Sequence, residues 1–394
     1  MKKIRESYNH TIYACYMGYV TQAIVNNFIP LLFLTFHKTY GIPLNQIALL
    51  VSFNFGIQLL TDIVAAKYAA KIGYRRCLVG AHILCALGLV GLAFLPSSFP
   101  NAFVGILCSV FLYAVGGGLI EVLISPTVES CPSDNKEAAM SLSHSFYCWG
   151  HVGVVLISTG FFVVFGIENW EYMSIVWAMI PILNGLYFSC VPLATLEEES
   201  KNTSLKELFK QKTFWGFIIL MLCSGAAEQS MSQWASAFAE KGLGVGKTVG
   251  DLLGPCAFAV FMGLSRVFYG KYGEKIAIRP FMVGSSILCV ISYLIAGLSQ
   301  NPFVGLVGCM LCGISVGIMW PGTFSIGAKA VGNSAAMGAM FALGGDVGCS
   351  VGPAVVGFVA DAFGENLQLG ILASIVFPIL LILGILIAKK NKKI

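Results

Sequence analysis

The sequence predicts an all-α integral membrane protein with twelve transmembrane helices in two six-helix bundles. Three observations lead to this prediction. Charged residues make up only 11% of the 394 residues and hydrophobic residues 57%, against roughly 25% and 45 to 50% in soluble globular proteins. Apolar stretches of roughly 20 residues, the length that spans about 30 Å of hydrocarbon, recur along the whole chain. The second half also repeats sequence features of the first half in the same order.

The twelve apolar stretches alternate with short polar connections, so each is expected to form one spanning helix. The first stretch follows a basic N-terminal region and lacks an A-x-A-like cleavage site, which favours a retained helix over a signal peptide. Many of the thirteen cysteines lie inside apolar runs and are expected to be small packing residues. The stretches lie near 11–36, 46–66, 77–95, 102–126, 139–165, 172–193, 214–239, 250–270, 280–298, 302–326, 335–361 and 368–388.

The distribution of basic residues predicts the orientation. All but three of the 24 Lys and Arg residues lie at the two termini or at the even-numbered connections, the exceptions being Lys38, Lys241 and Lys247. Short loops rich in Lys and Arg stay in the cytoplasm. We therefore expect a multi-pass protein of the cell membrane with both termini cytoplasmic. The net charge of +5 follows from this topology and gives no indication of nucleic-acid binding.

A polar segment, ATLEEESKNTSLKELFKQKTF, divides the chain into two similar halves. It predicts an N-terminal six-helix bundle at 1–193, a cytoplasmic linker at 194–213 and a C-terminal six-helix bundle at 214–394. The segments KYAAKIGYRRCLVGAHILC and KYGEKIAIRPFMVGSSILC share ten identities at an offset of 204, and NAFVGIL matches NPFVGLV at an offset of 200. Membrane proteins built from such repeats are commonly transporters whose substrate sites lie near the midplane, at the repeat interface.

This organisation resembles the major facilitator superfamily, which has twelve helices, a 6+6 repeat, a charged central loop and a basic connection after helix two. That connection here, AAKIGYRR, resembles the family's G-x-x-x-D-R-x-G-R-R signature, with Arg75 and Arg76 as its closing arginines. Ala70 stands where the signature has an acidic residue, and Asp62 is the candidate substitute. The resemblance implies a gating role for these charged residues.

Within the superfamily, GGGLIEVLISPTVES followed by AAMSLSHSFYCWG resembles the fucose-permease-like sugar:proton symporters. Those proteins have a helix-four Glu followed by Pro, and then a helix-five segment of small, polar and aromatic residues. Their helix-one carboxylate is absent here, where CYMGYVTQAIVNNFIP offers only Gln22, Asn26 and Asn27. The resemblance implies uptake of a sugar together with protons.

Three acidic residues inside the predicted helices are candidates for proton coupling. They are Glu121 in helix four, Glu228 near the midpoint of helix seven, and Asp346 near the midpoint of helix eleven. An ionised carboxylate in hydrocarbon costs roughly 2.5 to 3.5 kcal/mol, so it normally faces a cavity or a partner. The alternative for each is a structural contact that holds helices together.

Amide and aromatic residues inside the helices are the candidate ligands of a polar solute. Gln229 and Gln233 share a helical face, and Trp234 beside them offers a flat surface for a sugar ring. Two histidines of helix five lie on one face with Tyr147, but they are two turns apart and lack a zinc-like spacing, so no metal is expected. The full set is Asn26, Asn27, His144, Tyr147, Gln229, Gln233, Trp234 and Trp320.

A polar stripe along helix two, formed by Asn54, Gln58 and Asp62, ends near the cytoplasmic side. Asp62 aligns with Arg266 at the offset of 204. Opposite charges at equivalent positions predict separate ion-pair latches that break and reform during transport. Anchoring near the headgroups is the alternative.

Together these features predict a secondary active transporter that moves a small polar solute, a sugar or related polyol, by alternating access and with protons. Its partners are the solute, protons and the bilayer; we expect a monomer without a cofactor. A proton-driven efflux carrier for drugs or metabolites is the alternative. An intramembrane hydrolase using Asp346, or His144 with His151, is a remote one, because no paired acids or metal ligands support it, so no enzyme is expected.

Overall fold

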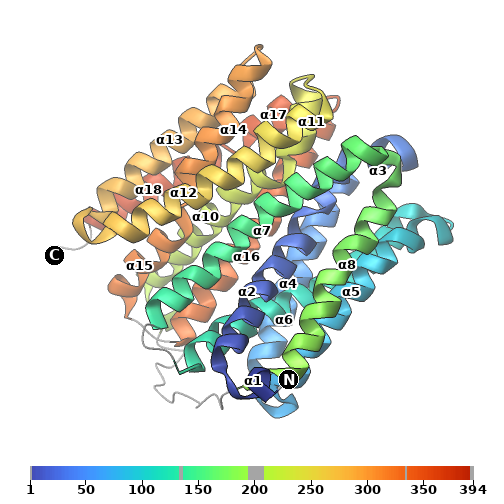
Figure 1. The fold of residues 1–394 in the computed structure, drawn as a ribbon. Coiled ribbons are helices and arrows are strands. Elements are labelled where there is room, and N and C mark those ends of the chain that lie inside the picture. Colours follow the sequence, from blue (N-terminus) through green and yellow to red (C-terminus); the bar gives the residue numbers. More distant parts are fainter. Residues whose placement is uncertain (1, 133–135, 194–207, 333–334, 391–394) are drawn as a thin grey trace. The chain divides into compact units, whose positions relative to one another are not determined.

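The computed structural model describes residues 2–132, 136–193, 208–332 and 335–390, and every regular element that these residues form is a helix (Figure 1). The predicted linker at 194–213 falls outside the described residues up to position 207. By their contacts the residues group into two compact units, one of 1–42 with 53–198 and one of 43–52 with 199–394.

The predicted all-α membrane fold is confirmed. Among the described residues, twelve helical segments are long and apolar enough to cross a membrane, and each overlaps one predicted stretch. They are Tyr8–Tyr40, Leu44–Ala65, Tyr74–Ser98, Ala102–Ser130, Ser145–Phe165, Ile167–Cys190, Lys212–Gly242, Lys247–Tyr272, Ile278–Leu298, Pro302–Val331, Met337–Ala362 and Leu367–Ile387.

The first six segments are built mostly from long single helices. In chain order the elements are α1 (Lys2–Glu6), α2 (Tyr8–Asn27), the 3-10 helix η1 (Ile29–Leu32), α3 (Phe33–Tyr40), α4 (Leu44–Ile72), α5 (Tyr74–Ser98), α6 (Ala102–Ser130), α7 (Lys136–Phe165), the 3-10 helix η2 (Ile167–Asn169) and α8 (Trp170–Cys190).

The last six segments are interrupted more often. Their elements are α10 (Lys212–Ala237), the π-helix η3 (Phe238–Gly242), α11 (Lys247–Asp251), the π-helix η4 (Leu252–Cys256), α12 (Ala257–Tyr272), the 3-10 helix η5 (Gly273–Lys275), α13 (Ile278–Leu298), α14 (Pro302–Val316), α15 (Met319–Val331), α16 (Ala335–Ala362), α17 (Leu367–Ala373) and α18 (Val376–Lys390).

Small residues allow the closest helix contacts, as expected where helices associate in lipid. In the first unit α5 packs along α6, and a Cβ built on Gly88 would lie 2.7 Å from the Ser109 carbonyl oxygen. In the second unit α10 packs along α16, and a Cβ on Gly348 would lie 2.0 Å from the Leu222 carbonyl oxygen. Backbones at these contacts therefore approach too closely for any side chain.

Two features of the sequence repeat recur in the fold. Helices α5 and α13 begin at positions 204 residues apart. Asn101 and Asn301 both cap the following helix, since the side-chain oxygen of each accepts a hydrogen bond from the backbone N–H two residues later, at 2.9 and 3.0 Å. Such a cap satisfies one of the N–H groups that a helix start leaves unbonded.

Candidate functional site

The glycine triplet that precedes Glu121 lets α6 approach three other helices at once. A Cβ built on Gly116 would meet α5 at Ala81 and Cys85, one on Gly117 would meet Val25 of α2 and Gln58 of α4, and one on Gly118 would meet α4 at Gln58, Thr61 and Asp62. The shortest of these distances is 2.5 Å, from Gly116 to the Ala81 carbonyl oxygen. The triplet therefore draws α6 against polar residues of its neighbours just before the carboxylate.

Glu121 has a direct partner on α2. The Gln22 side-chain Nε2 donates a hydrogen bond of 2.6 Å to Glu121 Oε2. Gln22 is buried, whereas Glu121 is half-buried. One turn further along α6, Ser125 lies 2.8 Å from the Tyr19 hydroxyl, so α2 and α6 are joined twice. An amide of the first span thus donates to the carboxylate of the fourth span.

Three more amides extend this polar group. Gln58 Nε2 donates to Asn26 Oδ1 at 2.8 Å and to Asn54 Oδ1 at 2.9 Å, and Asn54 Nδ2 donates to Asn26 Oδ1 at 3.0 Å. All three side chains are buried. Gln22 and Asn26 are four residues apart on α2 and so lie on one face. We call Gln22, Asn26, Asn54, Gln58 and Glu121 the first polar cluster.

Two other predicted solute ligands lie close to each other. Asn27 Nδ2 donates to the Ala23 carbonyl at 2.9 Å and, at 3.4 Å, to the hydroxyl of Tyr147 on α7. His151, one turn beyond Tyr147, is buried. His144 belongs to α7, but its side chain lies outside the described ones.

The second unit has a polar group of its own on α10. Glu228 Oε2 forms an ion pair of 3.3 Å with the Arg266 guanidinium of α12, and Gln229 Nε2 donates to Glu228 Oε1 at 3.3 Å. Gln233 Nε2 donates in turn to Gln229 Oε1 at 3.1 Å. We call Glu228, Gln229, Gln233 and Arg266 the second polar cluster. It brings together one predicted coupling residue, two predicted solute ligands and one predicted gating residue.

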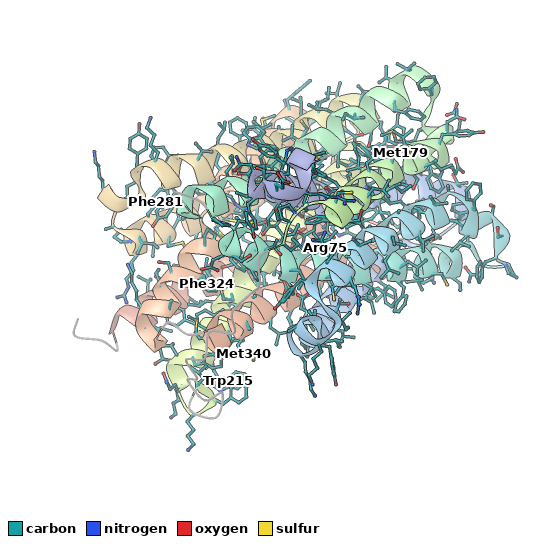
Figure 2. The ribbon with its side chains drawn as sticks, turned by 60° about the horizontal axis from the view of Figure 1, so that its bottom comes forward. Arg75, Met179, Trp215, Phe281, Phe324 and Met340 are labelled. Atoms are coloured by element: carbon teal, nitrogen blue, oxygen red, sulfur yellow. The ribbon has the colours of Figure 1, made fainter. Side chains whose placement is uncertain are left out.

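The predicted aromatic ligands contact protein in this structure. Trp234 is fully buried, and its indole Nε1 donates to the Pro353 carbonyl of α16 at 3.0 Å. Trp320 is half-buried and stacks on Phe324, which Figure 2 labels, with ring centroids 5.7 Å apart. A Cβ built on Gly345 would lie 2.5 Å from the Trp320 Nε1, so this ring lies over α16. The half-buried Asp346 is the next residue of that helix.

The candidate gating residues have different surroundings. Arg75 of α5, labelled in Figure 2, donates to the carbonyl oxygens of Phe188 and Ser189 at the end of α8, at 2.7 and 3.1 Å. A cation at this end of a helix also interacts favourably with the helix dipole. Arg76 is exposed and donates to the Ile72 carbonyl one turn earlier at 3.5 Å. Asp62 lies against Gly118, with its Oδ1 3.0 Å from the built Cβ.

Two buried polar groups were not predicted from the sequence. His82 Nδ1 donates to the Leu78 carbonyl at 2.7 Å, while Asn184 donates to His82 Nε2 at 2.8 Å and to the Ala14 carbonyl at 3.1 Å. This network joins α2, α5 and α8 and needs a neutral imidazole. No sequence spacing indicates it, because its members lie on three helices.

The other missed group is local in sequence. Asp251 accepts hydrogen bonds from Ser236 at 2.5 Å and from Lys247 at 3.0 Å. Lys247 and Asp251 are four residues apart, a spacing that predicts an ion pair on one helix. The ion pair between Lys247 and Asp251 could therefore have been predicted from the sequence.

Comparisons with known proteins agree with this fold. The profile of the Major Facilitator Superfamily matches residues 15–353. The L-fucose-proton symporter of Escherichia coli (strain K12) is 21% identical over 400 residues, which cover 91% of this chain and 89% of that protein.

Solved structures are also similar. A D-xylose-proton symporter superposes with a TM-score of 0.80 at 13% identity, covering 98% of both chains. A bacterial homologue of the human lysosomal transporter Spinster, inward-facing and occupied, also gives a TM-score of 0.80 at 13% identity, covering 98% of this chain and 97% of that one. The Escherichia coli fucose:proton symporter gives 0.65 at 17% identity, covering 99% and 100%. At these identities the structural likeness establishes the fold alone. Because the family profile matches most of the chain, this protein belongs to the Major Facilitator Superfamily and is a multi-pass membrane transporter.

Proposed function

We propose that this transporter takes up a sugar or related polyol together with protons, by alternating access, across the cell membrane and with both termini in the cytoplasm. The observation that carries the proposal is the 2.6 Å hydrogen bond from Gln22 to Glu121, within a buried cluster of amides. An ionisable residue inside a membrane segment is a functional candidate by default. Glu121 is the proposed site of proton binding.

The chemistry of the two polar clusters favours a polyhydroxylated solute. Each Asn or Gln side chain offers two N–H donors and a carbonyl acceptor, which matches hydroxyl groups that both donate and accept. Asn26 and Asn54 in the first polar cluster and Gln229 and Gln233 in the second supply such groups. Tyr147 and Trp320, both half-buried, are the proposed aromatic contacts.

The names of two similar proteins also support a sugar as the solute and protons as the coupled ion. One is a symporter of L-fucose and protons and another a symporter of D-xylose and protons. At 21% and 13% identity neither name transfers to this chain, so the sugar class and the coupling to protons are proposals.

Transport by a Glu121→Gln variant in proteoliposomes tests the coupling. Glutamine keeps the shape of glutamate and can hydrogen-bond to Gln22, but it cannot titrate. We expect this variant to exchange solute across the membrane and to lose accumulation when a pH gradient is imposed. The exposed Glu168 at the start of span six offers the control, and Glu168→Gln should retain both activities.

Two outcomes contradict this role for Glu121. Accumulation at the level of the unmodified protein would move proton coupling to Glu228 or Asp346. Loss of binding and exchange together would make Glu121 a solute ligand or a structural residue.

A thermal-shift panel tests the solute class. A ligand that binds only the folded state stabilises it by about 2.7 kcal/mol at 100 times its Kd. We expect pentoses, hexoses or polyols to raise the unfolding temperature. Stabilisation by cationic dyes and by no sugar would favour the efflux carrier instead.

A further inference from the structure

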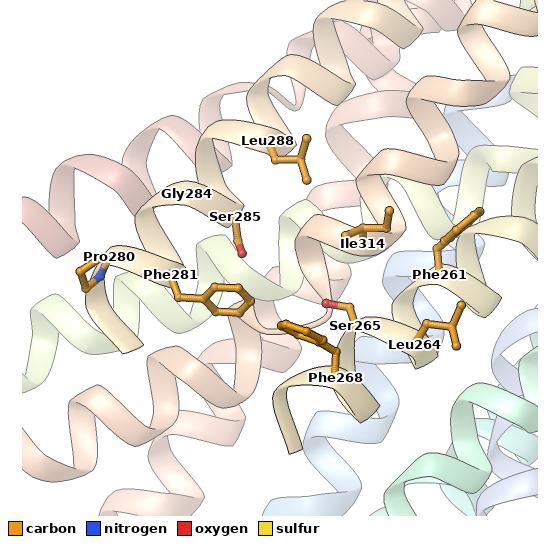
Figure 3. A pocket seen from close by; sticks show the side chains of 10 residues that line it. All are labelled: Phe261, Leu264, Ser265, Phe268, Pro280, Phe281, Gly284, Ser285, Leu288 and Ile314. Carbon is orange, nitrogen blue, oxygen red and sulfur yellow. The ribbon is translucent and has the colours of Figure 1, made fainter. Parts of the chain in front are cut away.

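The second unit has an apolar groove that the proposed transport function does not use. Helices α12 and α13 each pack against α14, and between them lies a groove of about 520 Å³, open along one side. Figure 3 shows Phe261, Leu264 and Phe268 on the α12 wall, with Phe281 on the α13 wall and Ile314 of α14 between the two helices. The groove lies within membrane-spanning segments.

Bulky apolar side chains of the α12 wall are exposed. Leu264 and Phe268 are 48% and 47% exposed. A Cβ built on Gly284 of α13 would meet no atom within 4 Å, so the α13 wall is open there. In a bilayer, hydrocarbon chains are the apolar groups available to cover these surfaces.

The chain segment that connects the two walls at one end of the groove is basic. Phe268 and Phe281 line that end (Figure 3), where α12 and α13 are joined through η5. The segment 271–279 contains Lys271, Lys275 and Arg279 with a single acidic residue. Arg279 directly precedes the lining residues Pro280 and Phe281. The apolar groove thus ends beside a segment of net positive charge, where α12 ends and α13 begins.

Comparison with the repeat singles out Arg279. Its equivalent at the offset of 204 is Arg75, whose guanidinium is engaged by the carbonyls at the end of α8. Arg279 is half-buried, and among the side chains that the structure describes none forms a hydrogen bond or ion pair with it. Arg75 therefore binds carbonyl groups at a helix end in the first half, whereas its equivalent Arg279 is available to bind an anion in the second half.

We propose that this groove binds one anionic phospholipid, with an acyl chain between α12 and α13 and the phosphate at Arg279, Lys275 and Lys271. The basic segment complements the phosphate of a phospholipid, and the apolar groove that leads away from it accommodates an acyl chain. Basic pockets between transmembrane helices recognise anionic head groups in this way. The proposal requires only that the chain spans a membrane and is independent of the transported solute.

Native mass spectrometry of the full chain tests the site. The detergent-purified protein would be titrated with phosphatidylglycerol and with phosphatidylcholine of identical acyl chains. We expect one phosphatidylglycerol to bind in preference to phosphatidylcholine. A Lys or Arg near an anionic surface contributes about 1 kcal/mol, or about fivefold in affinity, so Arg279→Gln should reduce this preference about fivefold. Lys212→Gln, at the start of α10, is the charge control and should leave it unchanged.

A second variant tests the groove itself. Gly284→Leu places a side chain in the open space of the wall and should reduce the occupancy of the first bound lipid, whichever head group it carries. Gly80 is its repeat equivalent, and a Cβ there also meets nothing within 4 Å, so Gly80→Leu is the matched control. Equal binding of the two lipids, or unchanged binding in both Arg279→Gln and Gly284→Leu, would overturn the proposal. A dimer that Gly284→Leu dissociates would overturn it in favour of a second copy of the chain.

Discussion

At the scale of single residues, the hydrogen bond between Gln22 and Glu121 is expected to stabilise the folded protein by a measurable amount. Leucine at position 22 would remove the donor and leave a half-buried carboxylate without it. Leaving a buried polar group unsatisfied costs roughly 1 to 3 kcal/mol, and partial exposure of Glu121 favours the lower end. We expect Gln22→Leu to lower the unfolding temperature in detergent.

The neighbouring residue provides a control for this prediction. Thr21 is buried, and in the described part of the chain its hydroxyl donates only to the Met17 carbonyl of its own helix, at 3.0 Å. Thr21→Val should therefore change the unfolding temperature less than Gln22→Leu. Equal shifts would mean that the bond to Glu121 contributes nothing specific.

The ion pair between Glu228 and Arg266 makes a second residue-scale prediction. Removing one partner of a buried pair costs 3 to 5 kcal/mol, more than the pair itself contributes. Because the Arg266 side chain is 30% exposed, we expect about 2 to 3 kcal/mol for Arg266→Gln. Glu228→Gln in the same chain should recover most of this loss. The measurement is a double-mutant cycle of thermal unfolding.

Transport by the same variants separates a structural pair from a functional one. If the pair only holds α10 to α12, the double variant transports normally. If the double variant is as stable as the unmodified protein but inactive, the pair belongs to the transport mechanism. Additive stability losses in the cycle would show that the two charges do not interact.

At the scale of helices, backbone contact between α10 and α16 depends on single glycines. A methyl group on Gly348 would lie 2.0 Å from the Leu222 carbonyl oxygen, so the helices must separate to accept it. Overpacking of this kind typically costs 1 to 3 kcal/mol. We expect Gly348→Ala to lower the unfolding temperature.

The chain offers a matched control for this substitution. A Cβ on Gly153 of α7 meets nothing within 4 Å, and alanine is a better helix former than glycine. Gly153→Ala should therefore be neutral or stabilising. Equal destabilisation by both substitutions would point to the loss of helix flexibility, and not to the contact with Leu222.

The helices themselves were predictable because hydrophobic length fixes a membrane span, whereas their interruptions were not. The 3-10 turn at Ile29–Leu32 contains Pro30, which gives a signal in hindsight. The π-helices Phe238–Gly242 and Leu252–Cys256 have no such common signal, since only the second contains a proline. Local backbone geometry there depends on packing partners that are distant in sequence.

At the scale of the whole molecule, the orientation is a prediction that fusion proteins can test. Basic residues should hold both termini in the cytoplasm. We expect green fluorescent protein fused after Ile394 to fluoresce and alkaline phosphatase at the same position to be inactive. Fusions after Gly244, in the turn between spans seven and eight, should show the opposite pattern. The reverse result at both positions would invert the topology.

The sequence predicted which residues are polar inside the membrane better than it predicted their partners. The stripe of Asn54, Gln58 and Asp62 was recognised from its spacing, because one helix face is a local property. The bond from Gln22 to Glu121 was not, because it joins spans one and four. The repeat aligned Arg266 with Asp62 and predicted a separate ion pair for each, but it did not identify Glu228 as the partner that Arg266 has in the structure. A sequence repeat identifies equivalent positions, whereas the contacts of a residue depend on which helices pack beside it.

The fourth and tenth spans are equivalent in the sequence repeat, at an offset of 200, and they differ in helix continuity as well as in charge. Gly117 lies inside the unbroken α6, whereas its equivalent Gly317 marks the break between α14 and α15. Where the fourth span carries Glu121 the tenth carries Pro321, which has no N–H to bond. The fourth span is thus one continuous helix with an ionisable side chain, whereas the tenth span is interrupted at the equivalent glycine. Backbone amides around Gly317 should therefore exchange with solvent deuterium sooner than those around Gly117. Such a result would indicate that span ten bends more readily than span four when the protein changes conformation.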